Sequence, residues 1–425
     1  MTIFISIVGL GVLIFVHELG HFAVSLALRM RPRKFYIGFP PAAVKRTRNG
    51  IEYGIGMIPL GGFVKIPGMH RPAPADVDAA LGRAVEEAPE LAGAADRLRR
   101  SLGAGDHDAA RDSLAVFAEL AAERPLSEQA AHGVEKGVAD IGDALGPDAY
   151  WRASTWKRVL VIFAGPAANI ILAAVIFTGL FMTSGGKPTT TVDSIRSGSA
   201  AAALGLQSGD RIISIDRVPM TAEIISGTIS ASKGKPLTVV VLRDESRVTL
   251  GPRAAQKDGG VYRLGFVLSG EGLSPPQAVK QSVRITGQVS QAIAVSLGRL
   301  VTGEGRKNIS SPIGIVQGSS DAAKQGTDSF LWVLGLISLS IALLNLLPLL
   351  PLDGGHIAFA IVEGIRGRTV GRGVYERVSI VGIGLVLLLF VIGLTNDIGR
   401  LSKPTGRTHP GAEAQRREDR GTGPA

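Results

Sequence analysis

Four long apolar segments constrain the fold of this 425-residue chain more than any other feature. Residues 2–16, 159–182, 330–350 and 378–395 contain no Asp, Glu, Lys, Arg or His. A helix that crosses a bilayer needs about 20 predominantly apolar residues, and each segment is close to that length. The whole chain is 45% hydrophobic and only 19% charged. We therefore expect a polytopic α-helical membrane protein with about four spanning helices, which excludes fully soluble, disordered and collagen-like classes.

The chain has no cysteine, which excludes disulfide frameworks, thiol catalysis and cysteine-bound zinc. Any metal ion must then be held by His, Asp or Glu. The first apolar run starts at Thr2 without a basic segment before it and continues to Leu28. We expect a retained first helix over 2–28 rather than a cleaved signal peptide.

The basic residues are distributed as membrane topology requires. The net charge is +10, and residues 29–49 hold seven basic residues and no acidic residue directly after the first apolar run. The positive-inside rule assigns such a block to the cytosol. With 29–158 cytosolic, 185–329 lies outside, and 351–377 with its four arginines returns to the cytosolic side. Topology accounts for the charge better than nucleic-acid binding does.

Two segments near the first span have a different character. Residues 51–66 are rich in β-branched, aromatic and glycine residues and predict strands around a turn at Gly61-Gly62. Residues 71–149 contain 8 basic against 16 acidic residues, so this stretch is strongly acidic. Its apolar residues recur at helical spacing, as at Leu91, Ala95, Leu98 and Leu102. We expect a soluble helical insertion there.

These patterns divide the chain into seven parts. They are the first spanning helix with the β-hairpin (1–70), the acidic helical insertion (71–150), the second spanning helix (151–184), a soluble α/β domain (185–270), an amphipathic interfacial segment (271–329), the third and fourth spanning helices (330–396) and a disordered polar tail (397–425).

The first span contains the motif His-Glu-Leu-Gly-His, with His17, Glu18 and His21. On a helix, positions i and i+4 lie one above the other, so both imidazoles can bind one metal ion. The intervening Glu18 can take a proton from a metal-bound water. Each ionisable residue near the centre of a spanning helix costs about 2.5–3.5 kcal/mol to insert, which favours a functional site over packing. The alternative is that the helix ends at Val16 and the three residues are interfacial.

A catalytic zinc ion usually has three protein ligands and a water. The candidate third ligand is Asp353, in the segment NLLPLLPLDGGH that starts at Asn345. It lies at the cytosolic end of the third span, at the depth expected for His17 and His21. The alternatives are that Asp353 only caps a helix end before two glycines, or that His356 is a ligand; we favour a supporting role for His356.

This combination resembles the site-2 protease family of intramembrane zinc metalloproteases, in its bacterial PDZ-containing form. Further segments resemble the family's reentrant β-hairpin (52–65), its second-span signature FAGPAAN (163–169) and another family segment (311–318), so the resemblance covers about 1–70 and 150–396. One departure is Pro351, which lies one residue later than the family pattern places the second proline after Asn345.

The resemblance implies a set of roles. It implies Zn²⁺ bound by His17, His21 and Asp353, with Glu18 as the general base and Asn345 near the oxyanion. The hairpin at Gly61-Gly62 would hold an unwound substrate as an added strand. Asn169 is expected to be a packing or gating residue.

Residues 189–268 resemble a bacterial PDZ domain, on the segments Ser199-Ala200 and 205–212. Such domains usually capture an extended peptide or a carboxy terminus by strand addition. The alternative is that this one only excludes large substrates. The resemblance places it outside the cytosol of a multi-pass cell-membrane protein, with the active site near the cytosolic side.

The activity implied is hydrolysis of peptide bonds within or near transmembrane segments, in single-span regulatory proteins or signal-peptide remnants. Two other classes remain open. A non-catalytic scaffold would need neither Glu18 nor Asp353, and a zinc transporter would carry polar ligands along several spans, whereas 378–395 has none.

Overall fold

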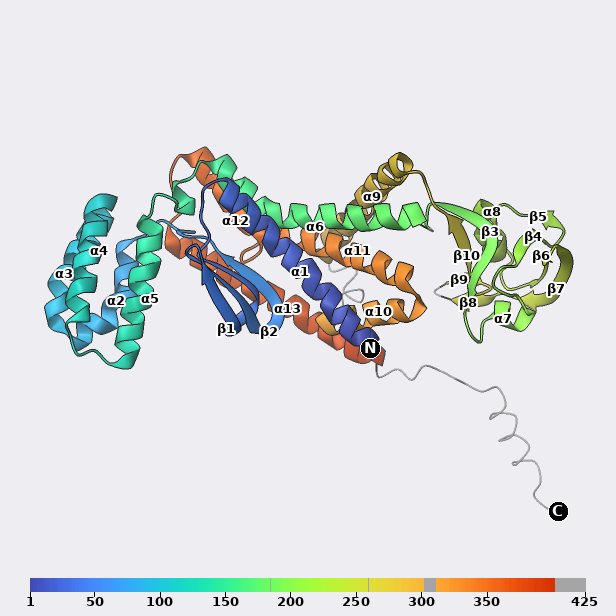
Figure 1. Ribbon diagram of the computed structural model, residues 1–425, viewed down its shortest axis with the longest axis horizontal. Coiled ribbons are helices and arrows are strands. Elements are labelled where there is room, and N and C mark those ends of the chain that lie inside the picture. The colour runs from blue at the N-terminus through green and yellow to red at the C-terminus, as the bar shows by residue number, and fades with distance from the viewer. Residues whose placement is uncertain (184, 259, 302–310, 402–425) are drawn as a thin grey trace, which may run out of the picture.

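The computed structural model describes residues 1–183, 185–258, 260–301 and 311–401 (Figure 1). Among these residues, four helices are long and apolar enough to cross a membrane, as the sequence predicts. They are α1 (Thr2–Ala27), α6 (Thr155–Thr183), α11 (Thr327–Asn345) and α13 (Arg372–Leu401). A helical bundle lies at one end of these helices and a mixed α/β unit lies at the other end.

α6 is the central helix of the membrane region. It packs against α1, α11, α9 (Pro275–Val301) and α12 (Asp353–Arg366). Apolar side chains of α6 and α11, among them Ala173, Phe177 and Leu339, form a buried cluster. Within the amphipathic segment predicted over 271–329, the structure has the helix α9.

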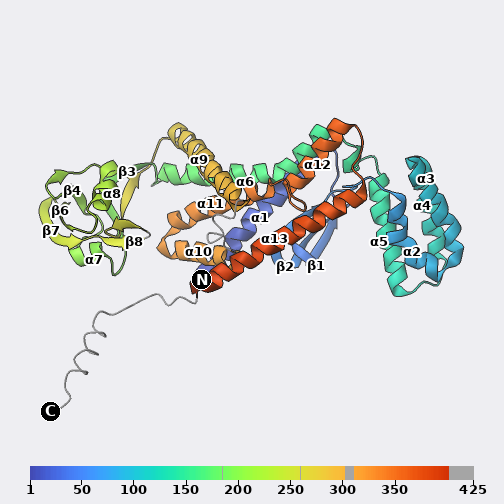
Figure 2. The same ribbon diagram turned by 180° about the vertical axis from the view of Figure 1, so that it is seen from behind.

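α10 (Pro312–Gln325) packs against both the first spanning helix, α1, and the last, α13. Its Ser320 hydroxyl donates to Thr2 on α1, while Asp397 on α13 accepts from the backbone N–H groups of Ser311 and Gly314. A carboxylate at a helix N-terminus satisfies donors that have no partner within the helix. Figure 2 shows the molecule from behind, with α13 toward the viewer.

The β-hairpin differs from the sequence prediction. Its strands are β1 (Lys34–Arg48) and β2 (Ile51–Lys65), so the predicted turn at Gly61-Gly62 is wrong and both glycines lie within β2. The chain turns at Asn49-Gly50, where both residues have positive φ (51° and 75°). Asn-Gly is the pair that a two-residue hairpin turn favours.

The hairpin is bent so that its strands pair twice. Lys34 pairs with both Glu52 and Lys65, and Ile37 pairs with both Ile55 and Gly62. The first residues of β1 therefore lie between two parts of β2. This bend carries Gly62 back toward α1.

The acidic stretch is helical, as predicted. The helix-spaced residues Leu91, Ala95, Leu98 and Leu102 are all buried in one apolar core. Arg33 forms ion pairs with Asp143 and Asp148, which fix this bundle to the base of the hairpin. Its elements are α2 (Pro74–Glu87), a 3-10 turn (Pro89–Leu91), α3 (Ala92–Ala104), α4 (His107–Ala122), α5 (Glu128–Leu145) and a second 3-10 turn (Tyr150–Arg152).

The α/β unit contains a sheet in the order β10-β3-β4-β6-β7, with β5 paired to β4. Inward-facing residues such as Ile212, Val239 and Val241 form its core. Its elements are β3 (Lys187–Ile195), α7 (Ala200–Leu204), β4 (Arg211–Ile215), β5 (Val218–Pro219), α8 (Ala222–Ala231), β6 (Pro236–Arg243), β7 (Ser246–Ala254), β8 (Gln256–Asp258), β9 (Val261–Arg263) and β10 (Phe266–Glu271).

A buried ion pair fixes the start of β4 in this unit. The Asp210 side chain is 1% exposed and accepts hydrogen bonds from the Arg243 guanidinium and from the backbone N–H of Gln207. Burial acts to raise the pKa of Asp210, but these hydrogen bonds outweigh it and the pKa lies below its ordinary value.

Two boundaries differ from the sequence prediction. The third apolar run was expected to reach residue 350, but α11 ends at Asn345. Pro348 lies just beyond it and cannot continue a regular helix. α13 extends to Leu401, past the predicted start of the polar tail, and 402–425 lie outside the described residues.

Candidate metal centre

One face of α1 carries both histidines. Its buried residues recur every three or four positions, at Ser6, Gly9, Leu13, His17, His21 and Ser25. α1 packs against α6 and α10. His17 and His21 are each 7% exposed, with ring centroids 4.9 Å apart. The four-residue spacing therefore places both imidazoles side by side, as predicted.

Asp353 reaches the same place from a distant part of the sequence. A short connection follows α11, and Asp353 is the first residue of α12. α12 is fixed to α6 by a buried ion pair, in which Arg158 Nη1 lies 2.6 Å from Glu363 Oε2. This pair helps to hold α12 against α6, and Asp353 reaches His17 and His21 from the first turn of α12.

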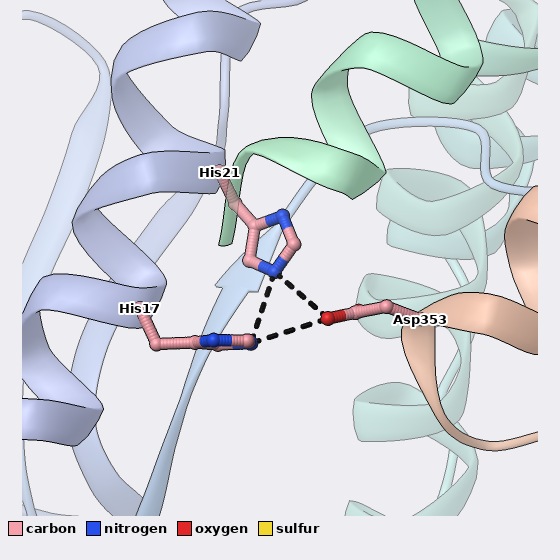
Figure 3. A group of neighbouring side chains, drawn as sticks. All are labelled: His17, His21 and Asp353. Carbon is pink, nitrogen blue, oxygen red and sulfur yellow. Dashed lines mark hydrogen bonds and ion pairs between the residues drawn. The ribbon is translucent and has the colours of Figure 1, made fainter. Parts of the chain in front are cut away.

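The three side chains converge on one point (Figure 3). Asp353 Oδ2 lies 3.2 Å from His17 Nε2 and 3.4 Å from His21 Nε2, and the two nitrogens are 3.3 Å apart. Ligand atoms at 2.0–2.1 Å from a tetrahedral zinc ion are separated by about 3.3–3.4 Å. Asp353 Oδ2 is also buried without a hydrogen-bond partner among the described residues. This oxygen needs a cation or a donor, and the three residues fit a zinc ion.

The backbone of α6 orients His21. The Nδ1 atom of His21 lies 2.9 Å from the carbonyl oxygen of Val161 and donates its proton there. The lone pair is then on Nε2, which faces His17 and Asp353. α6 comes this close because residue 165 is glycine; an added Cβ would lie 2.2 Å from His21 Nε2.

Glu18 lies between this cluster and the hairpin. It is half-buried and is not one of the three clustered residues. A Cβ on Gly62 would lie 2.8 Å from Glu18 Cγ and 2.8 Å from the Tyr36 carbonyl oxygen. The structure thus brings Gly62 against Glu18, with Gly61 before it in β2.

Two asparagines contact His17. Asn345, the last residue of α11, has its Nδ2 3.3 Å from His17 Nε2, so the structure places this residue beside the cluster. Asn169 on α6 has its Nδ2 3.5 Å from His17 Nδ1. Sequence reasoning treated Asn169 as a packing or gating residue and missed this contact. The only signal was an amide within an otherwise apolar span.

His356 is outside the three-residue cluster. Its Nδ1 is hydrogen-bonded to the Tyr375 hydroxyl. Both side chains line a cavity of about 330 Å³, together with Arg158, Glu363 and residues of the helical insertion. Burial lowers the pKa of His356 to about 4.

The chain is similar to known proteins over most of its length. The family model of peptidase family M50 matches residues 5–389. The zinc metalloprotease RasP of Bacillus licheniformis is 30% identical over 94% of this chain and 99% of the relative. The zinc metalloprotease RasP of Geobacillus kaustophilus is 29% identical over 92% of this chain and 96% of the relative. The regulator of sigma-W protease RasP of Bacillus subtilis is 28% identical over 94% of this chain and 99% of the relative. The chain therefore belongs to peptidase family M50, the site-2 protease family, and is a membrane zinc metalloprotease.

Proposed function

We propose that this protease cleaves membrane proteins within or near their transmembrane segments, with His17, His21 and Asp353 as the zinc ligands. The observation that carries the proposal is the convergence of two imidazole nitrogens and one carboxylate oxygen, 3.2–3.4 Å apart. These atoms come from α1 and from the helix that follows α11, so they meet among helices able to span a membrane.

Glu18 is the general base in this proposal. When bound, the zinc ion polarises the scissile carbonyl and lowers the pKa of its water toward about 7. Glu18 takes a proton from the attacking water and later returns it to the leaving amine. Its place next to the histidines, outside the ligand set, suits this role.

Asn345 stabilises the charge that develops on the substrate carbonyl. Its amide nitrogen lies beside His17 Nε2, so it can donate a hydrogen bond at the same centre. Removing one donor of this kind costs about 3–4 kcal/mol in other enzymes.

The hairpin holds the substrate. A peptide bond within a helix is shielded because its carbonyl is already hydrogen-bonded, so cleavage requires local unwinding. We propose that an unwound segment pairs with β2 near Gly61 and Gly62, as an added strand. The contact of Gly62 with Glu18 supports this assignment, because a strand placed there lies next to the base.

The orientation in the membrane follows from charge. We assign the acidic insertion (71–150) to the cytosol, the PDZ-like unit (185–270) to the opposite side and the metal centre to the cytosolic half. The basic block at 29–49 supports this assignment. The two units lie at opposite ends of the spanning helices, as the assignment requires (Figure 1).

The substrates in this proposal are single-span regulatory proteins or signal-peptide remnants, in regulated intramembrane proteolysis. One relative carries the name regulator of sigma-W protease, which supports a regulatory role here. The PDZ-like unit either binds a peptide or carboxy terminus of a partner or excludes large substrates.

Glu18→Gln tests this function. The amide cannot accept the proton of the water, so cleavage should slow by about 10²–10⁴-fold or more, while zinc content stays at the wild-type level. Glu119→Gln, an exposed residue of the insertion, is the matched control and should cleave normally. Membrane proteomes of cells with the wild type and with each variant would report which single-span proteins accumulate uncut. Cleavage by Glu18→Gln at the wild-type rate would contradict the protease mechanism.

A further inference from the structure

Asn169 is a fully buried amide facing the metal centre. Its side chain is 0% exposed and lies on α6 opposite His17. Its backbone carbonyl accepts a hydrogen bond from the Ser338 hydroxyl on α11, at 2.8 Å. The backbone of Asn169 therefore makes this contact between α6 and α11, and the side-chain amide of Asn169 takes no part in it.

The amide oxygen of Asn169 lacks a donor. Its Nδ2 lies 3.5 Å from His17 Nδ1, whereas its Oδ1 is buried with no hydrogen-bond partner among the described residues. Leaving a buried amide oxygen without a donor is unfavourable. The two ends of an amide have nearly the same shape, so a half-turn of the group places Oδ1 toward His17 instead.

The proton on His17 decides which orientation is favoured. A zinc ligand must present a bare nitrogen, and His17 Nε2 is the atom that faces Asp353 and His21. The ring proton of a metal-bound His17 is then on Nδ1 and requires an acceptor. For His21 the acceptor is the Val161 carbonyl. For His17 the neighbouring polar group at Nδ1 is the amide of Asn169.

We propose that Asn169 is the positioning residue for His17, through its amide oxygen. With zinc bound, Oδ1 accepts the Nδ1–H of His17 and fixes the ring with Nε2 toward the metal. This inference rests on the proposed role of His17 as a ligand.

Three variants of the full-length protein test whether the Asn169 side chain accepts the hydrogen bond from His17. Asn169→Leu has a similar volume but no polar atom, and zinc affinity should fall by about 10–100-fold. Asn169→Asp keeps the acceptor and should bind zinc within about threefold of the wild type. Ser338→Ala removes the hydroxyl that contacts the Asn169 backbone, so it controls for loosening of α6 against α11 and should keep wild-type affinity.

Zinc affinity is measured by competition with a chelator in detergent. The geometry of the ligands is measured from the visible absorption spectrum of the Co²⁺-substituted protein. The spectra of wild type and Asn169→Asp should coincide, while that of Asn169→Leu should differ. Wild-type affinity in Asn169→Leu, or equal weakening in Asn169→Asp and Asn169→Leu, would overturn the proposal. If Asn169→Leu does not fold, Asn169→Ala replaces it with the same expected loss.

His17→Ala separates this inference from the proposed function. Wild-type zinc affinity in His17→Ala would remove His17 from the ligand set, and with it the function proposed above. Loss of zinc in His17→Ala together with full affinity in Asn169→Leu would reject only the role of Asn169.

Discussion

Gly165→Ala probes the packing that holds His21 in place. The added Cβ would lie 2.2 Å from His21 Nε2, 2.6 Å from Cε1 and 2.7 Å from Cδ2. Ordinary contacts between such atoms are about 3.5–4.0 Å, so the ring must move by about 1 Å. That movement also lengthens the hydrogen bond from His21 Nδ1 to Val161.

The effect on zinc binding should be large. Ligand distances in a zinc site tolerate deviations of about 0.2 Å, well below the required movement. Loss of an orienting partner alone typically lowers metal affinity by 10–100-fold. We expect Gly165→Ala to lower zinc affinity by at least about 100-fold, which corresponds to about 2.8 kcal/mol at 1.4 kcal/mol per tenfold change.

Gly179→Ala is the matched control on the same helix. No atom lies within 4 Å of a Cβ added at Gly179, so this variant should bind zinc as the wild type does. Zinc per folded protein is measured by elemental analysis of the monodisperse fraction, with chelator competition for the affinity. Equal zinc affinity in Gly165→Ala and the wild type would refute the packing of His21 against α6.

Two further predictions concern the soluble parts. The native chain has no cysteine, so Ser246→Cys should react with an impermeant maleimide added to intact cells and Ala104→Cys should not; the reverse pattern would contradict the orientation. Because the pKa of Asp210 is lowered in the folded state, its contribution to stability should be complete above the ordinary carboxyl pKa of about 4 and be lost as the pH falls below it. Asp210→Asn should cost about 2–4 kcal/mol at neutral pH. Hydrogen exchange of β4 and β6 in the intact protein measures both effects, and protection in Asp210→Asn equal to the wild type would contradict the ion pair's role.

Much of the site could be predicted because its signals are local. The spacing of His17 and His21 on a helix fixes their common face, and ionisable residues in an apolar span are costly enough to indicate function. Asp353 is far from them in the sequence, and its pairing with them rests on the need for a third ligand, on membrane depth and on the family resemblance. The structure brings the three residues together.

The hairpin shows where local reasoning chose the wrong signal. Two glycines favour a turn at Gly61-Gly62, whereas the stronger turn signal, Asn49-Gly50, lies at the end of the basic block 29–49, which is interpreted only for its charge. β1 was missed for the same reason. The contact of Gly62 with Glu18 depends on the bend of the hairpin, which no short sequence window contains.

The groups that orient His17 and His21 could not be predicted from the pattern of residue types in the sequence. Val161 acts through its backbone carbonyl, which leaves no trace in the side-chain sequence. Asn169 and Gly165 matter because α6 approaches α1 closely, and that distance is set by the packing of the whole bundle.

X-ray absorption at the zinc edge tests the central claim most directly. The purified protein should show one zinc ion with nitrogen and oxygen ligands at about 2.0–2.1 Å, including two imidazoles. Asp353→Ala should lose most of the zinc. Retention of the wild-type spectrum and zinc content in Asp353→Ala, or a third imidazole in the wild-type spectrum, would contradict the site formed by His17, His21 and Asp353.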